Sequence, residues 1–116
     1  MMYYDFEAGN KAYKLRLNTR ALVELEKRIG CNPLNILGDT LPTVSEMVAV
    51  LHASLQQYQH GITLNDAYDI LDAYLETNTI ENFVFVILEV YAASGLIDKD
   101  KLEEVKNSVS GEEVKN

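Results

Sequence analysis

Residues 43–58, TVSEMVAVLHASLQQY, decide the fold, because they carry both the start signal and the buried face of one helix. Thr43 and Glu46 have the spacing of a capping box, in which each side chain accepts from the other residue's backbone N–H. Apolar residues then recur every three or four positions, which indicates a helix that ends near Tyr58. Its predicted buried face consists of Val44, Met47, Val48, Leu51, Leu55 and Tyr58.

Two more helices follow along the chain. Thr63 and Asp66 repeat the box-like spacing and predict a helix over residues 64–76. A helix over residues 80–94 is predicted between a threonine cap and a stop glycine. The predicted buried faces are Leu64, Ala67, Tyr68, Leu71, Tyr74 and Leu75 in the first helix, and Ile80, Phe83, Val84, Ile87 and Tyr91 in the second.

On the N-terminal side, the pattern changes to short alternating runs. Residues 3–6 and 12–17 flank Gly9-Asn10, a pair that suits a tight turn with positive φ, so a β-hairpin is predicted. A helix over residues 20–29 follows, with Thr19 as its predicted cap. Its predicted buried stripe is Ala21, Leu22, Leu25 and Ile29, and Asn32-Pro33 then predicts one short helical turn.

These elements predict a mainly α protein, a small helical bundle with an N-terminal β-hairpin. Hydrophobic residues make up 47% of the 116 and charged residues 24%, as in ordinary globular domains. We predict one helical domain over residues 1–98 and a charged, partly disordered tail over 99–116, with a weak helical window at 101–109. The predicted core draws on Leu22, Leu25, Leu51, Leu55, Leu71, Leu75, Phe83 and Ile87.

Charge is distributed unevenly along the chain. Residues 1–28 hold six basic and four acidic side chains, whereas residues 29–98 hold nine acids and no Lys or Arg. A surface that follows phosphates needs clustered Lys and Arg, so nucleic-acid binding is disfavoured. A basic protein partner, or the chain's own N-terminal segment, is the expected electrostatic complement.

The compartment expected for the protein is the cytoplasm. The single cysteine, Cys31, excludes an internal disulfide framework and suits a reducing environment. The first residues lack the features of a signal peptide, and the longest apolar run, residues 83–88, is too short to span a bilayer.

Residues that could carry chemistry are few. His52 and His60 are the only imidazoles, and an enzymatic role would pair them with Asp66 and Asp69. A metal site needs three or four converging ligands and a general base needs a nucleophile beside it; neither pattern is present. A row of aspartates that includes Asp72 is expected to be a solvated helix face. The sequence therefore predicts no enzyme activity, no catalytic or metal-ligating residues and no cofactor.

The helix over residues 80–94 carries more apolar side chains than one buried stripe needs. Phe85 and Val86 lie off the stripe, next to Glu81 and Glu89. A helix that is apolar on nearly every side must be buried on nearly every side. We expect these four residues to form a partner-binding face, since exposed apolar patches mark interaction sites.

Several segments resemble the tail assembly chaperones of long-tailed phages and prophages of Gram-positive bacteria. The resemblance lies in KLRLNTRALVELEK (14–27), GCNPLNIL (30–37), GITLNDAYD (61–69) and the apolar helix that ends at Gly95, and it covers about residues 10–96. The charged tail after Asp98 lies outside it. These segments are structural signals, not catalytic motifs.

The resemblance implies a helical protein that works during virion morphogenesis in the host cell cytoplasm and is absent from the mature virion. Its partners would be the tape measure protein, which it coats, and the tail tube protein, whose subunits it helps to recruit, with self-association as a further contact. From the charge pattern and the short apolar runs, we expect no nucleic-acid partner and no membrane partner.

Two other functions remain open from the residues alone. One is a non-viral helical adaptor or regulator that self-associates through its last apolar helix. The other is a small hydrolase that uses His60 and the aspartates. A gene for a long helical protein immediately downstream would favour the chaperone, and loss of turnover on changing His60 would favour the hydrolase.

The charge pattern predicts negligible affinity for duplex DNA even at low salt, because residues 29–98 offer no Lys or Arg to the phosphates. An electrophoretic mobility shift assay at micromolar protein checks this. A shifted band that weakens as salt is added would contradict the prediction.

Overall fold

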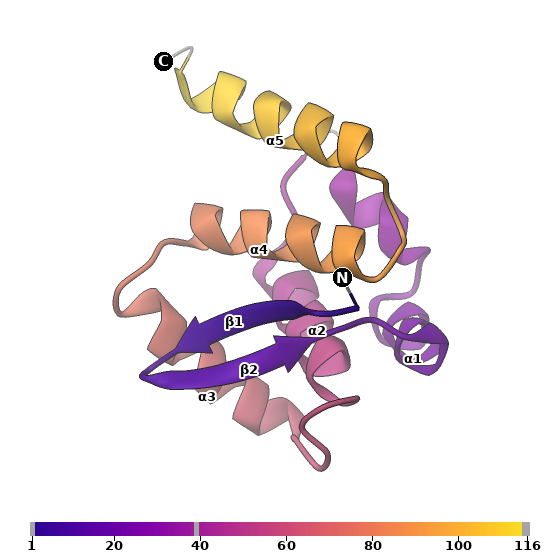
Figure 1. Ribbon diagram of the computed structural model, residues 1–116, viewed down its shortest axis with the longest axis vertical. Coiled ribbons are helices and arrows are strands. Elements are labelled where there is room, and N and C mark those ends of the chain that lie inside the picture. Colours follow the sequence, from indigo (N-terminus) through magenta and orange to yellow (C-terminus); the bar gives the residue numbers. More distant parts are fainter. Residues whose placement is uncertain (1, 39, 115–116) are drawn as a thin grey trace.

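The computed structural model describes residues 2–38 and 40–114, with side chains as far as residue 109. In that part of the chain, a two-stranded antiparallel hairpin is followed by five α-helices and one short 3-10 helix (Figure 1). The elements are β1 (Tyr4–Ala8), β2 (Lys11–Leu15), α1 (Thr19–Ile29), η1 (Pro33–Leu37), α2 (Val44–Leu55), α3 (Leu64–Leu75), α4 (Ile80–Ala93) and α5 (Lys99–Val114). The prediction of a mainly helical protein that begins with a β-hairpin is confirmed.

Helix α2 lies at the centre, in contact with α1, α3, α4 and β2. It is buried along most of its length because small residues such as Ala49 and Ala53 alternate with large ones such as Met47 and Leu51. Ser54 is also buried, and its hydroxyl donates to the Leu51 carbonyl at 3.0 Å. The capping box of α2 is present as predicted.

The hairpin has a two-residue turn at Gly9 and Asn10, with φ of 56° and 68°. Both values are positive, as the tight turn of a twisted hairpin requires. A Cβ added to Gly9 would lie 3.0 Å from the Cβ of Ala73 in α3, so glycine also allows the turn to approach that helix. Phe6 projects from β1 into the core, where its ring packs edge-on to the ring of Phe83 of α4. The two ring centroids are 5.9 Å apart.

Hydrogen bonds attach β2 and the following linker to α2, to the loop after α2 and to the end of α4. The Arg16 N–H donates to the Ser54 carbonyl of α2 at 2.9 Å. The Gln59 side-chain amide accepts from the Lys14 N–H at 2.8 Å and donates to the Lys14 carbonyl at 2.9 Å. Farther along, the Leu17 N–H donates to the hydroxyl of Ser94, at the end of α4, at 2.8 Å. Residues distant in sequence therefore hold the hairpin in place.

Most helix boundaries agree with the prediction, but the cap of α1 does not. The side chain that accepts from the Ala21 N–H belongs to Asn18, not Thr19, and α1 begins at Thr19. Asn18 is favoured because its side-chain N–H also donates to Gln57 at 3.0 Å, which a threonine at position 19 does not do. Helix α2 ends at Leu55, earlier than the predicted Tyr58.

Three residues assigned to buried faces are exposed instead. Val44, Tyr58 and Tyr68 keep 55%, 37% and 50% of their surface in contact with solvent. Val44 is the first residue of α2, and Tyr68 lines an open hollow that α3 shares with α1 and α2. On α3, Ile70 is buried instead. Of the predicted core, Leu25, Leu51, Leu55, Leu71, Phe83 and Ile87 are buried, and Leu22 and Leu75 are partly buried.

The segment predicted as a charged tail contains helix α5, which exceeds the predicted window of 101–109 at both ends. It follows a turn at Gly95 (φ 83°) and runs back along α4 in the opposite direction (Figure 1). Leu102 of α5 is buried, so this helix belongs to the folded structure. The part of the predicted disorder that falls on residues 115–116 lies outside the described residues.

Replacing Leu51 with alanine should lower the free energy of unfolding by about 2–5 kcal/mol, because it leaves a cavity in the most enclosed helix. Chemical denaturation followed by circular dichroism measures the loss. Val44→Ala, on the same helix but exposed, is the matched control and should cost about 0.5 kcal/mol or less. Equal midpoints for the two variants would mean that α2 does not lie at the centre.

Candidate functional site

The partner-binding face predicted on α4 is only partly formed as expected. Phe85 is half-buried and lies outside the cluster of buried core residues. Val86 is 6% exposed and belongs to that cluster, so the prediction that it stays outside the bundle is wrong. The reason is that β1 packs against α4 on this side, and Val86 shares a hollow there with Tyr4 and Phe6.

The two acidic residues of the predicted face have different surroundings. Glu81 is half-buried in the first turn of α4, where a negative charge interacts favourably with the helix dipole. Glu89, two turns later, forms an ion pair with Lys106 of α5. It also lies close enough to Tyr4 to raise the pKa of that hydroxyl, after burial, which is the larger cause.

The outer side of α4 around Glu89 is covered by α5. Among the α5 side chains up to residue 109, Leu102 is buried, and Val105 and Val109 are half-buried. These three positions repeat at helical spacing, with Lys106 beside them. A hollow of about 480 Å³ remains between β1, the end of α4 and the start of α5. The outer side of α4 thus carries an acidic residue, Glu89, and is already in contact with one helix of this chain, α5.

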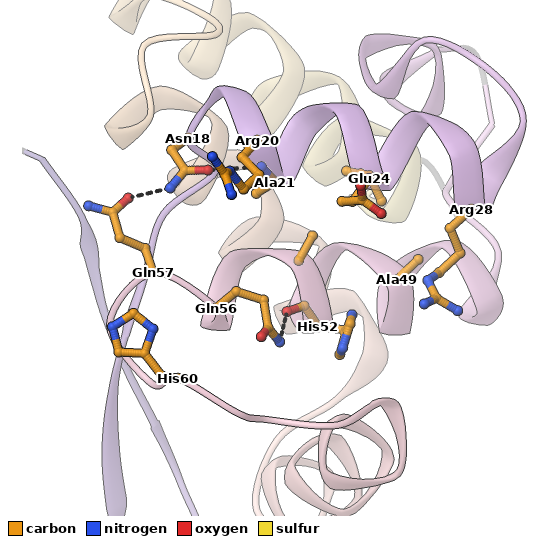
Figure 2. A pocket seen from close by; sticks show the side chains of 12 residues that line it. Asn18, Arg20, Ala21, Glu24, Arg28, Ala49, His52, Gln56, Gln57 and His60 are labelled. Atoms are coloured by element: carbon orange, nitrogen blue, oxygen red, sulfur yellow. Dashed lines mark hydrogen bonds between the residues drawn. The ribbon is translucent and has the colours of Figure 1, made fainter.

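A second feature is a cavity of about 530 Å³ between α1 and α2, which the sequence did not predict (Figure 2). Helix α1 contributes Arg20, Glu24 and Arg28 at intervals of four residues, which place them on one side of the helix. Helix α2 contributes His52 from the facing side, and His60 lies at the opposite end of the cavity from Arg28.

The two histidines therefore share one cavity with basic residues instead of with the aspartates. Burial and the nearby Arg28 charge lower the pKa of His52, while a hydrogen bond to the Ile62 carbonyl acts in the opposite direction. Asp66 and Asp69 line a different hollow, beside the hairpin turn. The arrangement that a hydrolase based on His60 and these aspartates would need is not assembled.

Asp66, the first aspartate of the row on α3, has a structural role. The Thr63 N–H donates to Asp66 at 2.9 Å, and this hydrogen bond lowers the pKa of the Asp66 carboxyl. Asp69 and Asp72 are exposed. Within the described residues, no group of three or more His, Cys, Asp or Glu side chains is placed to hold a metal ion.

Fold and surface together define a small, mainly helical protein with an N-terminal hairpin, an outer helix that covers α4 and a basic cavity. The chain belongs to a family described as "Family of unknown function (DUF6096)", whose model matches residues 5–116. No curated protein and no solved structure matches it. None of the helices in the described part of the chain is long and apolar enough to cross a membrane.

The packing of α5 should depend on Leu102, which is buried. Leu102→Ala should increase amide hydrogen exchange in α5 about tenfold or more, equivalent to about 1.4 kcal/mol, with little change in α2. Hydrogen exchange followed by mass spectrometry measures both helices in one sample. Glu103→Ala, at the exposed neighbouring position, is the control. Equal protection of α5 in both variants would show that Leu102 does not hold this helix.

Proposed function

We propose that this protein is a phage tail assembly chaperone in which a helix of the tape measure protein displaces α5 and binds the outer face of α4. In this proposal the protein shields apolar segments of that partner in the host cytoplasm and helps to recruit tail tube subunits. It acts by binding alone.

The observation that supports this proposal most is the contact between α4 and α5. Helix α5 of this chain already lies along α4, with Leu102 buried and Lys106 paired to Glu89. The face can therefore accept a helix with this side-chain pattern. A half-buried phenylalanine, Phe85, lies one helical turn before Glu89 on α4 and supplies an aromatic contact of the kind that dominates interface energies.

The contact also indicates what the partner helix would look like. In α5, Leu102 is buried, Val105 and Val109 are half-buried, and Lys106 pairs with Glu89 of α4. We expect the partner helix to carry apolar residues at the same spacing and a basic residue that replaces Lys106 as the partner of Glu89. Helix binding to an apolar groove commonly uses anchors at these intervals.

The sequence resemblance over about residues 10–96 is the second support, and it concerns the hairpin, α1, η1, α3 and α4. A tape measure protein is long and helical, so it offers many amphipathic helices to such a face. The alternative, a helical adaptor that self-associates through α4, would use the same surface with a second copy of this chain as the occupant.

Phe85→Ser should abolish co-purification with a co-expressed tape measure protein and leave the melting temperature within a few degrees of the native value, because the buried stripe of α4 is unchanged. Val23→Ser is the matched control, since Val23 is an exposed apolar residue on α1 and should not affect binding. Affinity purification and thermal denaturation are measured on the same preparations.

Three results would contradict the proposal. Unchanged co-purification of Phe85→Ser would remove Phe85 from the interface, and a collapsed fold would place it in the core. Loss of a homodimer in Phe85→Ser, seen by light scattering in the absence of any tape measure protein, would instead support the self-associating adaptor.

A further inference from the structure

The cavity between α1 and α2 brings two arginines and one acid together in a protein whose net charge is −8. Two of the chain's three arginines and both of its histidines line it. Arg20 and Arg28 come from α1, His52 from α2 and His60 from the loop that follows α2. Residues 29–98 contain no Lys or Arg. Both arginines that line the cavity therefore come from α1.

The floor of the cavity is apolar and made of small residues. Ala21 of α1 faces Ala49 and Ala53 of α2, and Leu25 completes the floor. Short side chains at these three positions leave a space of about 530 Å³ between the two helices. Sites for small ligands typically have volumes of several hundred cubic ångströms and an apolar lining with a few polar groups.

The amide side chains at the rim are already engaged with the protein. Asn18 donates to Gln57 at 3.0 Å, and Gln56 donates to the carbonyls of His52 and Ile62 at 3.0 and 2.9 Å. These bonds hold the rim in a defined shape. The charged side chains are therefore the groups that would select a ligand.

Along α1, the two arginines lie toward opposite ends of the cavity, and one acidic side chain lies between them. Figure 2 shows Arg28 reaching from α1 toward His52, with Arg20 near the other end of the helix and Glu24 between the two arginines. Glu24 is exposed and lies 3.8 Å from Lys27. Burial lowers the pKa of His52, and the Arg28 charge lowers it further; an anion between Arg28 and His52 would offset the repulsion from Arg28.

We propose that this cavity binds a small organic anion, with its carboxylate or phosphate head between Arg28 and His52 and its apolar body on the alanine floor. The guanidinium of an arginine binds either head through two parallel hydrogen bonds. A long polyanion is disfavoured, because the acidic surface of the rest of the protein would repel it. The site is independent of the α4 face and of the proposed chaperone function.

The test uses the full chain and three probes of similar size: phenyl phosphate, benzoate and the uncharged benzyl alcohol. Binding is followed by NMR through the backbone amides of α1 and α2 and the imidazole resonances of His52. We expect saturable shifts with at least one anion and a raised His52 pKa in the complex. The tighter of the two anions identifies the head group.

Arg28→Gln should weaken anion binding about tenfold or more, because a charge-assisted pair of hydrogen bonds is lost. Lys11→Gln is the matched control: it removes one positive charge at the hairpin turn, outside the cavity, and should change affinity less than twofold. Glu24→Gln should strengthen binding, since it removes the acid from the cavity. This gain also tests the site if the Arg28 variant proves unstable.

Equal weakening by Arg28→Gln and Lys11→Gln would overturn the proposal, because it would show attraction by net charge only. Benzyl alcohol binding as tightly as the anions would show that the cavity selects apolar bodies and not charge. Absence of saturable shifts with both anions at about 10 mM, a concentration that detects even a millimolar Kd, would remove the site.

Discussion

The enclosure of α2 is the constraint on which the rest of the structure depends. From Met47 to Leu55 this helix carries buried side chains on almost every side, so it is stable only when several elements cover it. The helices α1, α3 and α4 and the strand β2 do this together. One side of α4 packs against α2, and a second side packs against the hairpin. The remaining outer face of α4 is covered by α5.

Local signals predicted most of the secondary structure. The capping boxes at Thr43 and Thr63, the cap at Thr79 and the hairpin turn at Gly9-Asn10 all occur where the sequence places them, because each depends on neighbours within four residues. The cap of α1 was missed because Asn18 and Thr19 are both good caps. The choice between them is made by Gln57, a residue distant in sequence.

Properties set by tertiary packing could not be predicted in the same way. Periodicity identifies a buried stripe but not how many neighbours a helix has, so Val86 was placed outside although β1 covers it, and Tyr68 was placed inside although its side chain is exposed. The cavity between α1 and α2 was missed for the same reason. The four-residue spacing of Arg20, Glu24 and Arg28 was a signal for it, but only the packed helices bring His52 and His60 to the same place.

The hydrogen bonds between Gln59 and Lys14 have a consequence for how the protein behaves at high concentration. A two-stranded sheet has open edges, and such edges can pair with strands of other molecules and start aggregation. At Lys14 the outward N–H and carbonyl of β2 are both taken by one side chain. Another strand could add at this point only by displacing Gln59. The loop after α2 thus blocks intermolecular pairing at this residue of the β2 edge without a third strand.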